Sequence, residues 1–338
     1  MGAQLIRMSV LCSGSYLADF IVPDLPGIGE PGSLVYAPRG IHLSPGGHSA
    51  NVALDLAQLG HGAVHSTGCV GDDGLGELIV AHLRSHGVQT HPQVTGGAAT
   101  AKNIALIVRN QDRRFIAELA ANTLLEPERV EALVRDLRPA VFYQGTVGGL
   151  RYVDPRLDVV LGAAHAVGSL TVVDVVPPTY GWGNLLDALG GVDLLHCNLD
   201  EGRDMLGADE PGEVLDGLIS LGVGLAAVSD GAEGLYASTG ALTVHMPAFS
   251  VTDVDPTGAG DALCAGLIKA LIDEGVPRSR ITFLDAEGLT ALMLRGQAAG
   301  AACVARVGAT AAVTRRNVDS LIEDQAARLL DSTTVEDA

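Results

Sequence analysis

The chain has 338 residues, which allows one large domain or two smaller ones. It is 47% apolar and 18% charged, so it has enough material for a buried core and is not a disordered protein. Its 21 lysines and arginines stand against 40 aspartates and glutamates, a net charge of −19. A chain this acidic is repelled by phosphates, which argues against nucleic acid or an anionic membrane as its partner.

Short apolar runs alternate with helical patterns along most of the chain. The expected strands, bounded by turn residues, are Ile6–Cys12, Ser66–Val70, Ala140–Gln144, Leu170–Val175, Asp193–Cys197 and Leu225–Ser229. The expected helices are Ser49–Leu59, Gly74–Ser85, Pro127–Asp136, Arg156–Ala166, Asp200–Leu206, Pro211–Leu221, Gly258–Glu274, Gly288–Val304 and Arg316–Leu330. This alternation is typical of βαβ units and predicts an α/β fold with a central, mostly parallel sheet.

Two stretches break this alternation. Residues 16–45 are rich in proline and glycine around an extended-looking Leu34–Pro38. Residues 98–121 contain a hairpin pattern, with strands Asn103–Arg109 and Arg114–Leu119. We expect both stretches to leave the main sheet and form a small β-sheet lid, with surface decoration as the alternative. No linker or repeat is evident, so the whole chain is expected to be one domain with this lid.

The cysteines and the start of the chain indicate a cytoplasmic protein. Arg7 interrupts the first apolar run, which is unlike a secretory signal, and no run of about 18 uncharged apolar residues could span a membrane. The cysteines form no C-x-x-C pair, as expected of reduced thiols rather than of disulfides or a zinc site. They are Cys12, Cys69, Cys197, Cys264 and Cys303.

The sharpest motif is D-P-T-G-A-G-D at 255–261, which opens a predicted helix. Gly258, Ala259 and Gly260 are small, so a ligand can approach their backbone closely. Their N–H groups would lie in the first helical turn, where donors lack helical partners and the dipole favours an anion. Asp261 beside such an anion suits a base that takes a proton from an attacking hydroxyl. The alternative is a capped helix start with a glycine turn.

Two other phosphate-binding motifs are excluded. The only lysines, Lys102 and Lys269, do not lie in the G-x-x-x-x-G-K-[ST] context of a Walker-type loop. The first strand runs through Cys12–Tyr16 to Asp19 rather than into a helix, so it lacks the G-x-G-x-x-G fingerprint of dinucleotide-binding proteins. Phosphate is therefore expected to meet backbone amides, with or without a metal ion.

With these motifs the chain resembles the PfkB-type, ribokinase-like carbohydrate kinases. The motif at 255–261 is similar to the family's C-terminal signature. Three further matches precede it in the family's order: G-G-H-S-A-N-V-A at 46–53, N-L-D-E at 198–201 and S-D-G-A-E-G at 229–234. The resemblance covers about residues 8 to 315. It implies the ribokinase-like three-layer α/β/α fold.

The resemblance also implies an activity, the transfer of the γ-phosphoryl group of ATP to a hydroxyl of a sugar or sugar-like molecule. In this family the aspartate that matches Asp261 is the catalytic base. The backbone of Gly258, Ala259 and Gly260 matches the family's anion hole. Such a site suits phosphoryl transfer, in which catalysis is mostly positioning and stabilisation of charge.

Nucleotide and metal residues are implied in the same way. Asn198 and Glu201 match the family's N-x-x-E motif, in which the glutamate acts through water on Mg²⁺; a helix cap is the alternative. Ser229, Gly231 and Gly234 match the loop that contacts ATP, with a simple turn as the alternative.

One further segment, around Gly308, resembles the part of the family fold that closes over adenine. In some members this segment helps to hold a monovalent cation such as K⁺. The residues that share this cation match Asp255 and Thr257 here.

On the substrate side, Asp19 matches an aspartate that hydrogen-bonds sugar hydroxyls. Gly46, Gly47 and Asn51 match the glycine pair and the asparagine of the sugar pocket. Gln144 stands near a position that is often acidic in sugar-kinase relatives. A carboxylate and an amide suit a polyol, which offers both donors and acceptors.

Two departures argue against ribose itself: Gln144, and His48–Ser49 where ribokinase carries Lys-Gly. A free sugar or polyol is the first expectation for the substrate. A nucleoside or phosphosugar kinase, or a non-catalytic sugar-binding relative, is the alternative. The resemblance also implies a homodimer through the lid.

Overall fold

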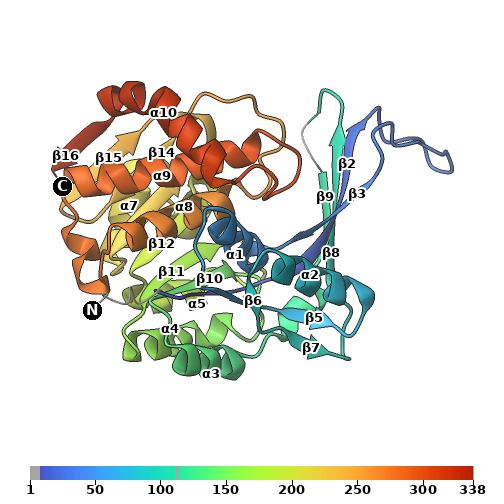
Figure 1. The fold of residues 1–338 in the computed structure, drawn as a ribbon, viewed down its shortest axis with the longest axis horizontal. Coiled ribbons are helices and arrows are strands. Elements are labelled where there is room, and N and C mark those ends of the chain that lie inside the picture. The colour runs from blue at the N-terminus through green and yellow to red at the C-terminus, as the bar shows by residue number, and fades with distance from the viewer. Residues whose placement is uncertain (1–7, 112–113, 338) are drawn as a thin grey trace, which may run out of the picture.

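The computed structural model describes residues 8–111 and 114–337. The strands of its large sheet are β1 (Val10–Ser13), β4 (Val64–Thr67), β6 (Gln89–Thr90), β10 (Val141–Val147), β11 (Leu170–Val175), β12 (Leu194–Asn198), β13 (Leu225–Ser229), β14 (Leu235–Ser238), β15 (Leu242–Met246) and β16 (Thr334–Asp337). Within the described residues they lie in the order β16-β15-β14-β13-β12-β11-β10-β1-β4-β6 (Figure 1). From β13 to β6 the strands are parallel, and β14 to β16 extend the sheet antiparallel at one edge.

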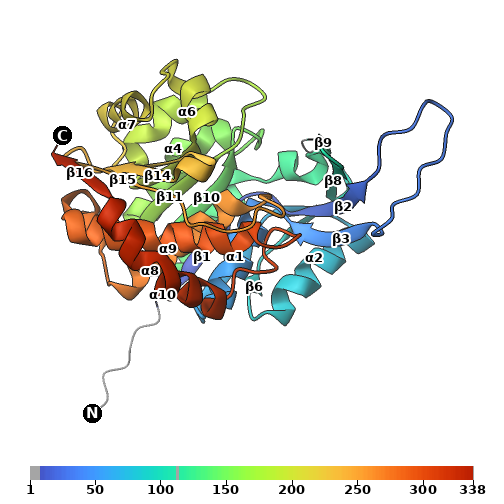
Figure 2. The same cartoon turned by 90° about the horizontal axis from the view of Figure 1, so that it is seen from above.

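Helices cover both faces of this sheet (Figures 1 and 2). One layer consists of α1 (His48–Gln58), α2 (Gly74–Ser85), α8 (Ala259–Asp273), α9 (Ala286–Val304) and α10 (Arg315–Ser332). The other consists of α3 (Pro127–Leu137), α4 (Leu157–Ala166), α5 (Gly183–Ala188), α6 (Leu199–Leu206) and α7 (Pro211–Ser220). Short 3₁₀ turns are η1 (Ala120–Leu124), η2 (Asp154–Arg156), η3 (Leu189–Gly191), η4 (Gly231–Glu233) and η5 (Arg278–Phe283). The fold is therefore the three-layer α/β/α arrangement that the alternation predicts.

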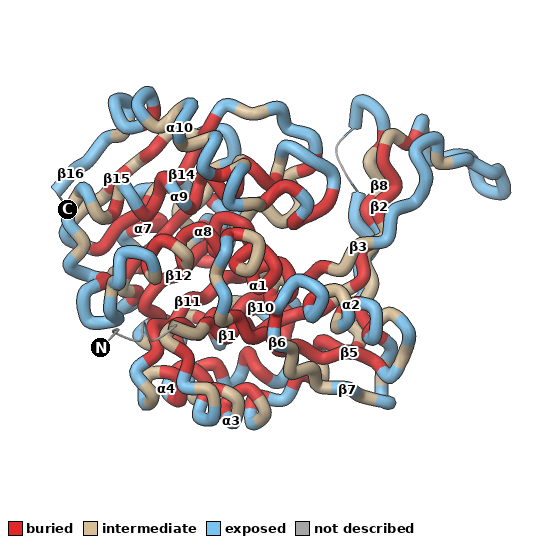
Figure 3. The backbone as a smooth tube through the Cα atoms, in the orientation of Figure 1, coloured by how far each residue is buried: buried red, intermediate tan, exposed pale blue. Residues whose placement is uncertain are grey.

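Each helical layer encloses its own apolar core. Tyr143 on β10 packs with α1 and α8, whereas its neighbour Phe142 packs with α3 and α4. Successive strand side chains point to opposite faces, so a strand covered on both sides must be apolar throughout. In Figure 3 the buried residues accordingly run through the middle of the large sheet, with exposed residues on the outer helices and loops.

A separate four-stranded sheet stands off the end of the large one (Figures 1 and 2). Its strands, in spatial order, are β3 (His42–Gly46), β2 (Leu17–Leu25), β8 (Ala101–Val108) and β9 (Arg114–Glu118). They come from the two stretches expected to leave the main sheet. The loop between β2 and β3 protrudes far from the body and carries exposed apolar residues, among them Leu34 and Tyr36.

Several local expectations need correction. Leu34–Pro38 is part of the protruding loop and not a strand. The expected strand Ser66–Val70 is two strands: β4 in the large sheet and β5 (Cys69–Gly71), which pairs with β7 (Gln93–Thr95). The break falls at Gly68, where an added Cβ would lie 2.8 Å from the Tyr16 ring. Residues 6 and 7 of the first expected strand lie outside the described residues.

Of the edge strands, only part of β15 was expected, as an extended segment Val244–Val254; β14, β16 and α5 were not expected. β14 to β16 pair through their backbones at the open edge of the sheet, and β16 comes from the end of the chain, about 90 residues after β15. Its four residues are all exposed and carry no alternating apolar pattern that would indicate a strand.

The carboxyl ends of the parallel strands bring polar residues together at one edge, some from the motifs and some from outside them. Ser13, Asp174, Asn198 and Ser229 all lie at the ends of their strands. This edge of an open α/β sheet is where ligands bind. It faces the small sheet.

All five cysteines are free thiols and buried. Burial raises the pKa of Cys69 to about 11 and raises the pKa values of Cys12, Cys197, Cys264 and Cys303 as well. Among the described residues, no helix is both long and apolar enough to cross a membrane.

Candidate active site

The motif at 255–261 forms the start of α8, as predicted. Gly258 precedes the helix with φ of 83°, a left-handed conformation that glycine adopts without strain. A Cβ there would lie only 2.5 Å from the Cβ of Ala309. The Ala259 N–H bonds to Pro256 O at 3.2 Å, while Gly260 and Asp261 follow in the first turn, where N–H groups have no partner inside the helix.

Asp261 is the buried acid at this helix start. Its Oδ2 accepts a hydrogen bond from Asn51 Nδ2 at 2.8 Å, so the two motifs 210 residues apart meet here. Its Oδ1 is buried and has no hydrogen-bond partner among the described residues. Burial raises the pKa of Asp261 to about 6. The group is therefore poised as a proton acceptor near neutral pH, with one oxygen fixed and one uncommitted.

Asp19 on β2 approaches from the small sheet. Its Oδ1 accepts from Asn103 Nδ2 at 2.9 Å, and burial raises its pKa to about 6. A Cβ at Gly46 would lie 2.0 Å from Asp19 Oδ2, and one at Gly47 would lie 2.4 Å from a backbone oxygen. A side chain at Gly46 would therefore displace the Asp19 carboxylate, and one at Gly47 would collide with the backbone of Ser15. Asn103 is a polar contact that the sequence did not single out.

Gln144 is not brought together with these residues. It lies two positions after Phe142 and shares that face of β10, opposite to the face of Tyr143 and α8. Its Nε2 donates to the adjacent Gly145 O at 3.0 Å. The resemblance placed Gln144 near the sugar; among the described residues no hydrogen bond joins its side chain to Asp19, Asn51 or Asp261.

A cavity of about 280 Å³ opens from the start of α8 on the side of β13. It is lined by Ser229, Gly231, Gly234, Ala259 and Gly260, together with residues of α9 and the segment before α8. The loop expected to contact ATP and the helix start expected to bind phosphate therefore face one space.

Asn198 and Glu201 form a capping box at the start of α6. Asn198 Oδ1 accepts from the Glu201 N–H at 2.8 Å, and Glu201 Oε2 accepts from the Asn198 N–H at 2.9 Å. Asn198 pairs with Ser229 in the sheet, so this cap lies beside the nucleotide loop. Burial raises the pKa of Glu201. The helix cap, which was the alternative role for these two residues, is thus present. It uses Glu201 Oε2 and leaves Oε1 for a further role.

The loops around Asp255 and Gly308 are tied together. Asp255 is buried; its Oδ1 accepts from Thr257 N at 3.1 Å and its Oδ2 accepts from Gly308 N at 3.0 Å. Cys303 Sγ donates to Thr257 O and Ala309 O. Gly308 lines a different cavity, beneath the small sheet, and not the one that Ser229 lines.

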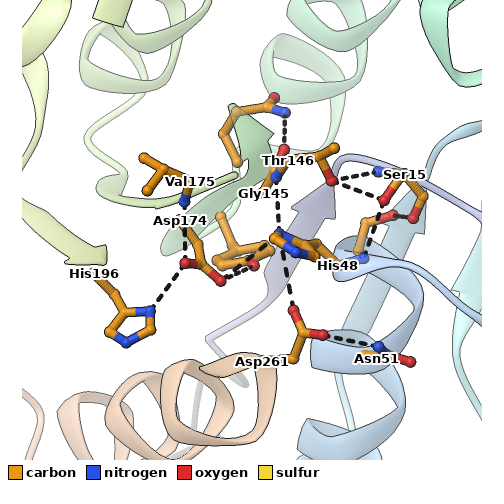
Figure 4. Close-up of polar contacts among 12 residues, drawn as sticks. Ser15, His48, Asn51, Gly145, Thr146, Asp174, Val175, His196 and Asp261 are labelled. Carbon is orange, nitrogen blue, oxygen red and sulfur yellow. Dashed lines mark hydrogen bonds and ion pairs between the residues drawn. The ribbon is translucent and has the colours of Figure 1, made fainter. Parts of the chain in front are cut away.

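The sequence missed a buried polar network beside Asp261 (Figure 4). Asp174 on β11 bonds His196 Nδ1 at 2.9 Å and accepts from the Tyr143 hydroxyl at 3.1 Å. His48 Nδ1 lies 3.8 Å from Asp174 and 3.9 Å from Asp261 Oδ1. The only sequence signals were an acid and a histidine near the ends of two neighbouring predicted strands. Their meeting follows from the register of β11 and β12.

His48 is held in one orientation. Its ring Nδ1 accepts from Thr146 N at 3.0 Å, and its backbone N donates to Ser15 Oγ. Although the nearby carboxylates raise the pKa of His48 against the opposing effect of burial, this closer hydrogen bond requires an unprotonated Nδ1 and places the ring proton on Nε2. Thr146 has φ of 61°, a strained value for a β-branched residue, and its Oγ1 bonds Ser15. Such strain marks functional sites.

A three-layer α/β/α fold with a buried aspartate at a glycine-rich helix start, faced by a small sheet, defines a small-molecule kinase. The chain belongs to the PfkB family of carbohydrate kinases: the family described as "pfkB family carbohydrate kinase" matches residues 8–316. It is accordingly a phosphotransferase that acts on a carbohydrate. The expected family, fold class and enzyme class are confirmed.

Similar proteins match most of the chain. It is 29% identical over 320 residues to "Probable fructokinase-7" of Arabidopsis thaliana, which spans 90% of this chain and 89% of the relative. It is 28% identical over 287 residues to "Aminoimidazole riboside kinase" of Salmonella typhimurium, 80% of this chain and 84% of the relative. The fold is similar to that of a fructokinase with bound ATP from Xylella fastidiosa, with a TM-score of 0.80, 24% identity and coverage of 95% and 100%.

Proposed function

We propose that this carbohydrate kinase transfers the γ-phosphoryl group of ATP to a hydroxyl of a free sugar or related polyol. One observation carries the proposal: Asp261 is buried at the start of α8, with Oδ2 fixed by Asn51 and Oδ1 uncommitted. On one side of it lies the cavity of the Ser229 loop, and from the small sheet comes the Asp19–Asn103 pair. A nucleotide and a polyol can thus approach one acid from two directions.

In the proposed reaction Asp261 Oδ1 takes the proton of the substrate hydroxyl as its oxygen attacks the γ-phosphorus. A new oxygen–phosphorus bond forms, the bond to the β–γ bridging oxygen breaks, and ADP leaves with that electron pair. The first-turn N–H groups of α8 receive the charge of the moving phosphoryl group. Gly258 and Gly260 keep the backbone free of side chains there.

Mg²⁺ fits the donor set on the nucleotide side. Glu201 is partly buried and its Oε2 is used in the cap, so Oε1 is the oxygen that we propose for water-mediated contact with the ion. Held there, Mg²⁺ would supply positive charge that offsets the charge of the nucleotide phosphates. A similar protein of known structure, a putative ribokinase II from E. coli, holds ATP and Mg²⁺.

We also propose that the loops of Asp255, Thr257 and Gly308 hold a monovalent cation. Both Asp255 oxygens already accept backbone N–H groups, so the loops are tied without an ion. A rate that rises when K⁺ replaces a bulky organic cation supports this proposal, and an unchanged rate contradicts it.

We base the proposed substrate class on the similar proteins and on the residues of the small sheet. The relatives include fructokinases and a riboside kinase, and Asp19 with Asn103 offers an acceptor and an amide to sugar hydroxyls. We propose that residues 16–45 and 98–121, which carry the small sheet, act as a lid that excludes water during transfer. A nucleoside or phosphosugar remains the alternative acceptor within the same chemistry.

The decisive experiment measures ADP release with fructose, other free sugars, polyols, a riboside and a sugar phosphate. Turnover with a free sugar or polyol supports the proposal, preference for the riboside or sugar phosphate selects the alternative, and no turnover contradicts both. Asp261→Asn should then lower kcat at least about a hundredfold, because it removes the proton acceptor. The variant should keep the wild-type affinity for ADP, measured by calorimetry. Near-normal turnover would remove Asp261 from this role.

We also propose the cytoplasm as the compartment and a homodimer through the lid as the assembly. Five free, buried thiols suit a reducing compartment, although one relative is described as chloroplastic. The apolar residues exposed on β9 and on the protruding loop support the dimer, because exposed apolar patches mark association surfaces.

A further inference from the structure

Phosphoryl transfer usually employs a cationic side chain, and the described residues place neither lysine of the chain at the start of α8. Lys102 pairs with Glu118 in the small sheet, and Lys269 pairs with Asp273 within α8. In the described part of the chain, none of the residues that line the nucleotide-side cavity is a lysine or an arginine. At the start of α8 the protein therefore offers the moving phosphoryl group backbone N–H dipoles and no lysine or arginine from the lining of this cavity.

One ionisable base does lie directly behind those dipoles. A Cβ added at Gly260 would be 3.1 Å from Cε1 of His196, so this ring packs against the first turn of α8 from the interior. His196 is 3% exposed. Its position in the middle of β12 places it between the sheet and the start of α8.

Both ring nitrogens of His196 are hydrogen-bonded. Nδ1 lies 2.9 Å from Asp174 Oδ1, and Nε2 lies 3.1 Å from Ser229 Oγ (the first bond is visible in Figure 4). A carboxylate on one side and a hydroxyl on the other can accept from both N–H groups of a protonated ring. Asp174 is itself fixed by the Tyr143 hydroxyl and by the Val175 N–H. The geometry thus accommodates an imidazolium whose position cannot change.

We infer that His196, held by Asp174, is a positioning residue that places a buried positive charge behind the backbone anion hole of α8. This inference rests on the proposed function and deepens it. Through Gly260 the ring adds positive potential where the transferred phosphoryl group gathers charge, without contacting it. Its bond to Ser229 also fixes the nucleotide loop to the same centre.

The electrostatic surroundings of His196 are mixed. Burial lowers the pKa of His196, but the Asp174 carboxylate more than offsets this, and Glu201 and Asp261 add to the increase. The same imidazole helps to keep the pKa of Asp174 below its ordinary value despite burial. The groups nearby are Asp174, Ser229, Glu201, Asp261, Cys264, His48 and Tyr143.

The first test does not depend on activity. In the nucleotide-free protein, the ¹⁵N resonances of the His196 ring should report an imidazolium at pH 7. Asp174→Asn should shift the His196 titration to lower pH, because it removes the neighbouring charge. A neutral His196 ring at pH 7 in the wild-type protein overturns the inference, whether or not the protein proves to be a kinase.

The second test uses turnover with the sugar identified by the substrate panel. His196→Asn can still bond Asp174 but carries no charge, so kcat should fall about tenfold, the size of a charge effect at a helix terminus, with the KM of the sugar unchanged. The wild-type kcat should also fall at alkaline pH as the ring loses its proton, and this limb should be missing in the variant. A purely structural role would not remove it.

The control is His165→Asn. His165 Nε2 lies 3.3 Å from Asp193 Oδ2, a second histidine–aspartate pair, on α4 and away from the site. This variant should keep both kcat and the pH profile. If turnover is normal in His196→Asn while the wild type is active, the inference fails and the proposed function stands. Should His196→Asn not fold, the ring resonances of the wild type decide alone.

Discussion

The two carboxyl oxygens of Asp261 have different surroundings. One oxygen is anchored by Asn51, and the other is buried without a partner among the described residues. Burial and the nearby Asp174 carboxylate disfavour the charged form, whereas the hydrogen bond from the Asn51 amide favours it, and the net result is a pKa raised to about 6. The acid is thus a stronger base than an exposed aspartate and is still ionised at neutral pH.

The first prediction concerns pH. Asp261 can accept a proton only when it is ionised, so its competence is lost as pH falls through about 6. We expect kcat/KM for the sugar to be level near pH 7 and to fall about tenfold per unit well below pH 6. The measurement is kcat/KM from pH 5 to 8 at saturating Mg²⁺ and ATP.

The control for this prediction is Asp19→Asn, because the pKa of Asp19 is also raised to about 6 by burial. If Asp261 is responsible, the acid limb persists in Asp19→Asn at a lower overall rate. A limb that disappears in that variant assigns the titration to Asp19 instead.

At this scale the sequence predicted the residues within contiguous motifs and missed those that meet only through the sheet. Asp261 and Gly258 were read from one motif, because their roles depend on neighbours in the chain. Asn103, Asp174 and His196 have no motif of their own; strand register brings them to the site. Gln144 was predicted at the sugar only from the family resemblance, and this placement stays a prediction.

At the scale of elements, most residues of the candidate site lie at the starts of helices. α1 begins after Gly47, α6 after Asn198 and α8 after Gly258, each at the carboxyl edge of the sheet. A helix start supplies unpaired N–H groups and a positive dipole end, so three of them make one edge attractive to anions. The alternation of strands and helices predicted this edge, because parallel strands connected by helices end on the same side.

The second prediction separates the cap of α6 from metal binding. Glutamine can replace glutamate in a capping box, so Glu201→Gln should leave the melting temperature almost unchanged. It removes the negative charge, so the Mg²⁺ concentration for half-maximal rate should rise about tenfold or more. The measurement is the initial rate against Mg²⁺ concentration.

Asp200→Asn is the matched control for Glu201→Gln. Asp200 lies in the same first turn, is fully exposed in its side chain and pairs only with Arg203 among the described residues. Its removal should not alter the Mg²⁺ requirement. Equal shifts in the two variants would show that Glu201 acts only through general charge.

The predictions of strands were wrong where packing against a neighbouring strand, and not the local sequence, decides whether a strand forms. The protruding loop contains apolar residues with a strand-like pattern, but they have no neighbouring strand to pair with. β16 lacks a strand pattern and exists because the edge of β15 offers it backbone partners. The backbone N–H and C=O groups of an open edge accept any extended segment within reach.

At the scale of the whole molecule, the core of the layer formed by α1 and α8 contains one acid that has no evident role. Asp55 on α1 is fully buried, and within the described chain neither of its oxygens has a hydrogen-bond partner. Burial raises the pKa of Asp55 well above its ordinary value. The folded protein therefore binds this proton more tightly than the unfolded chain does.

The third prediction follows from that difference in pKa. As pH rises above the unfolded value near 4, the unfolded chain ionises first, so the acid increasingly favours unfolding. Asp55→Asn should raise the free energy of unfolding by about 1 kcal/mol at pH 8 and by less at pH 5. Urea unfolding at both pH values measures this, with Asp187→Asn, exposed on α5, as control. An equal effect at both values contradicts it.

The fourth prediction concerns the lid dimer. Ile116 on β9 is 62% exposed, beside Phe115, on the sheet that we propose as the interface. Ile116→Lys should convert a dimer to a monomer in light scattering at micromolar concentration, because it places a charge in an apolar contact. Phe283→Lys, at a 72% exposed residue far along the chain in η5, should not. A wild-type monomer at high concentration would end this proposal.

The five thiols also determine how this molecule can be observed. Because every cysteine is buried and hard to ionise, a maleimide dye should leave the folded native chain unmodified. A single cysteine introduced at exposed Tyr36, on the tip of the protruding loop, would then carry the only dye. The sole tryptophan, Trp182, is anchored to Asp204 in the main body and could serve as the energy donor. A change in energy transfer between Trp182 and this dye when sugar and nucleotide are added would show whether the small sheet moves as the proposed lid requires.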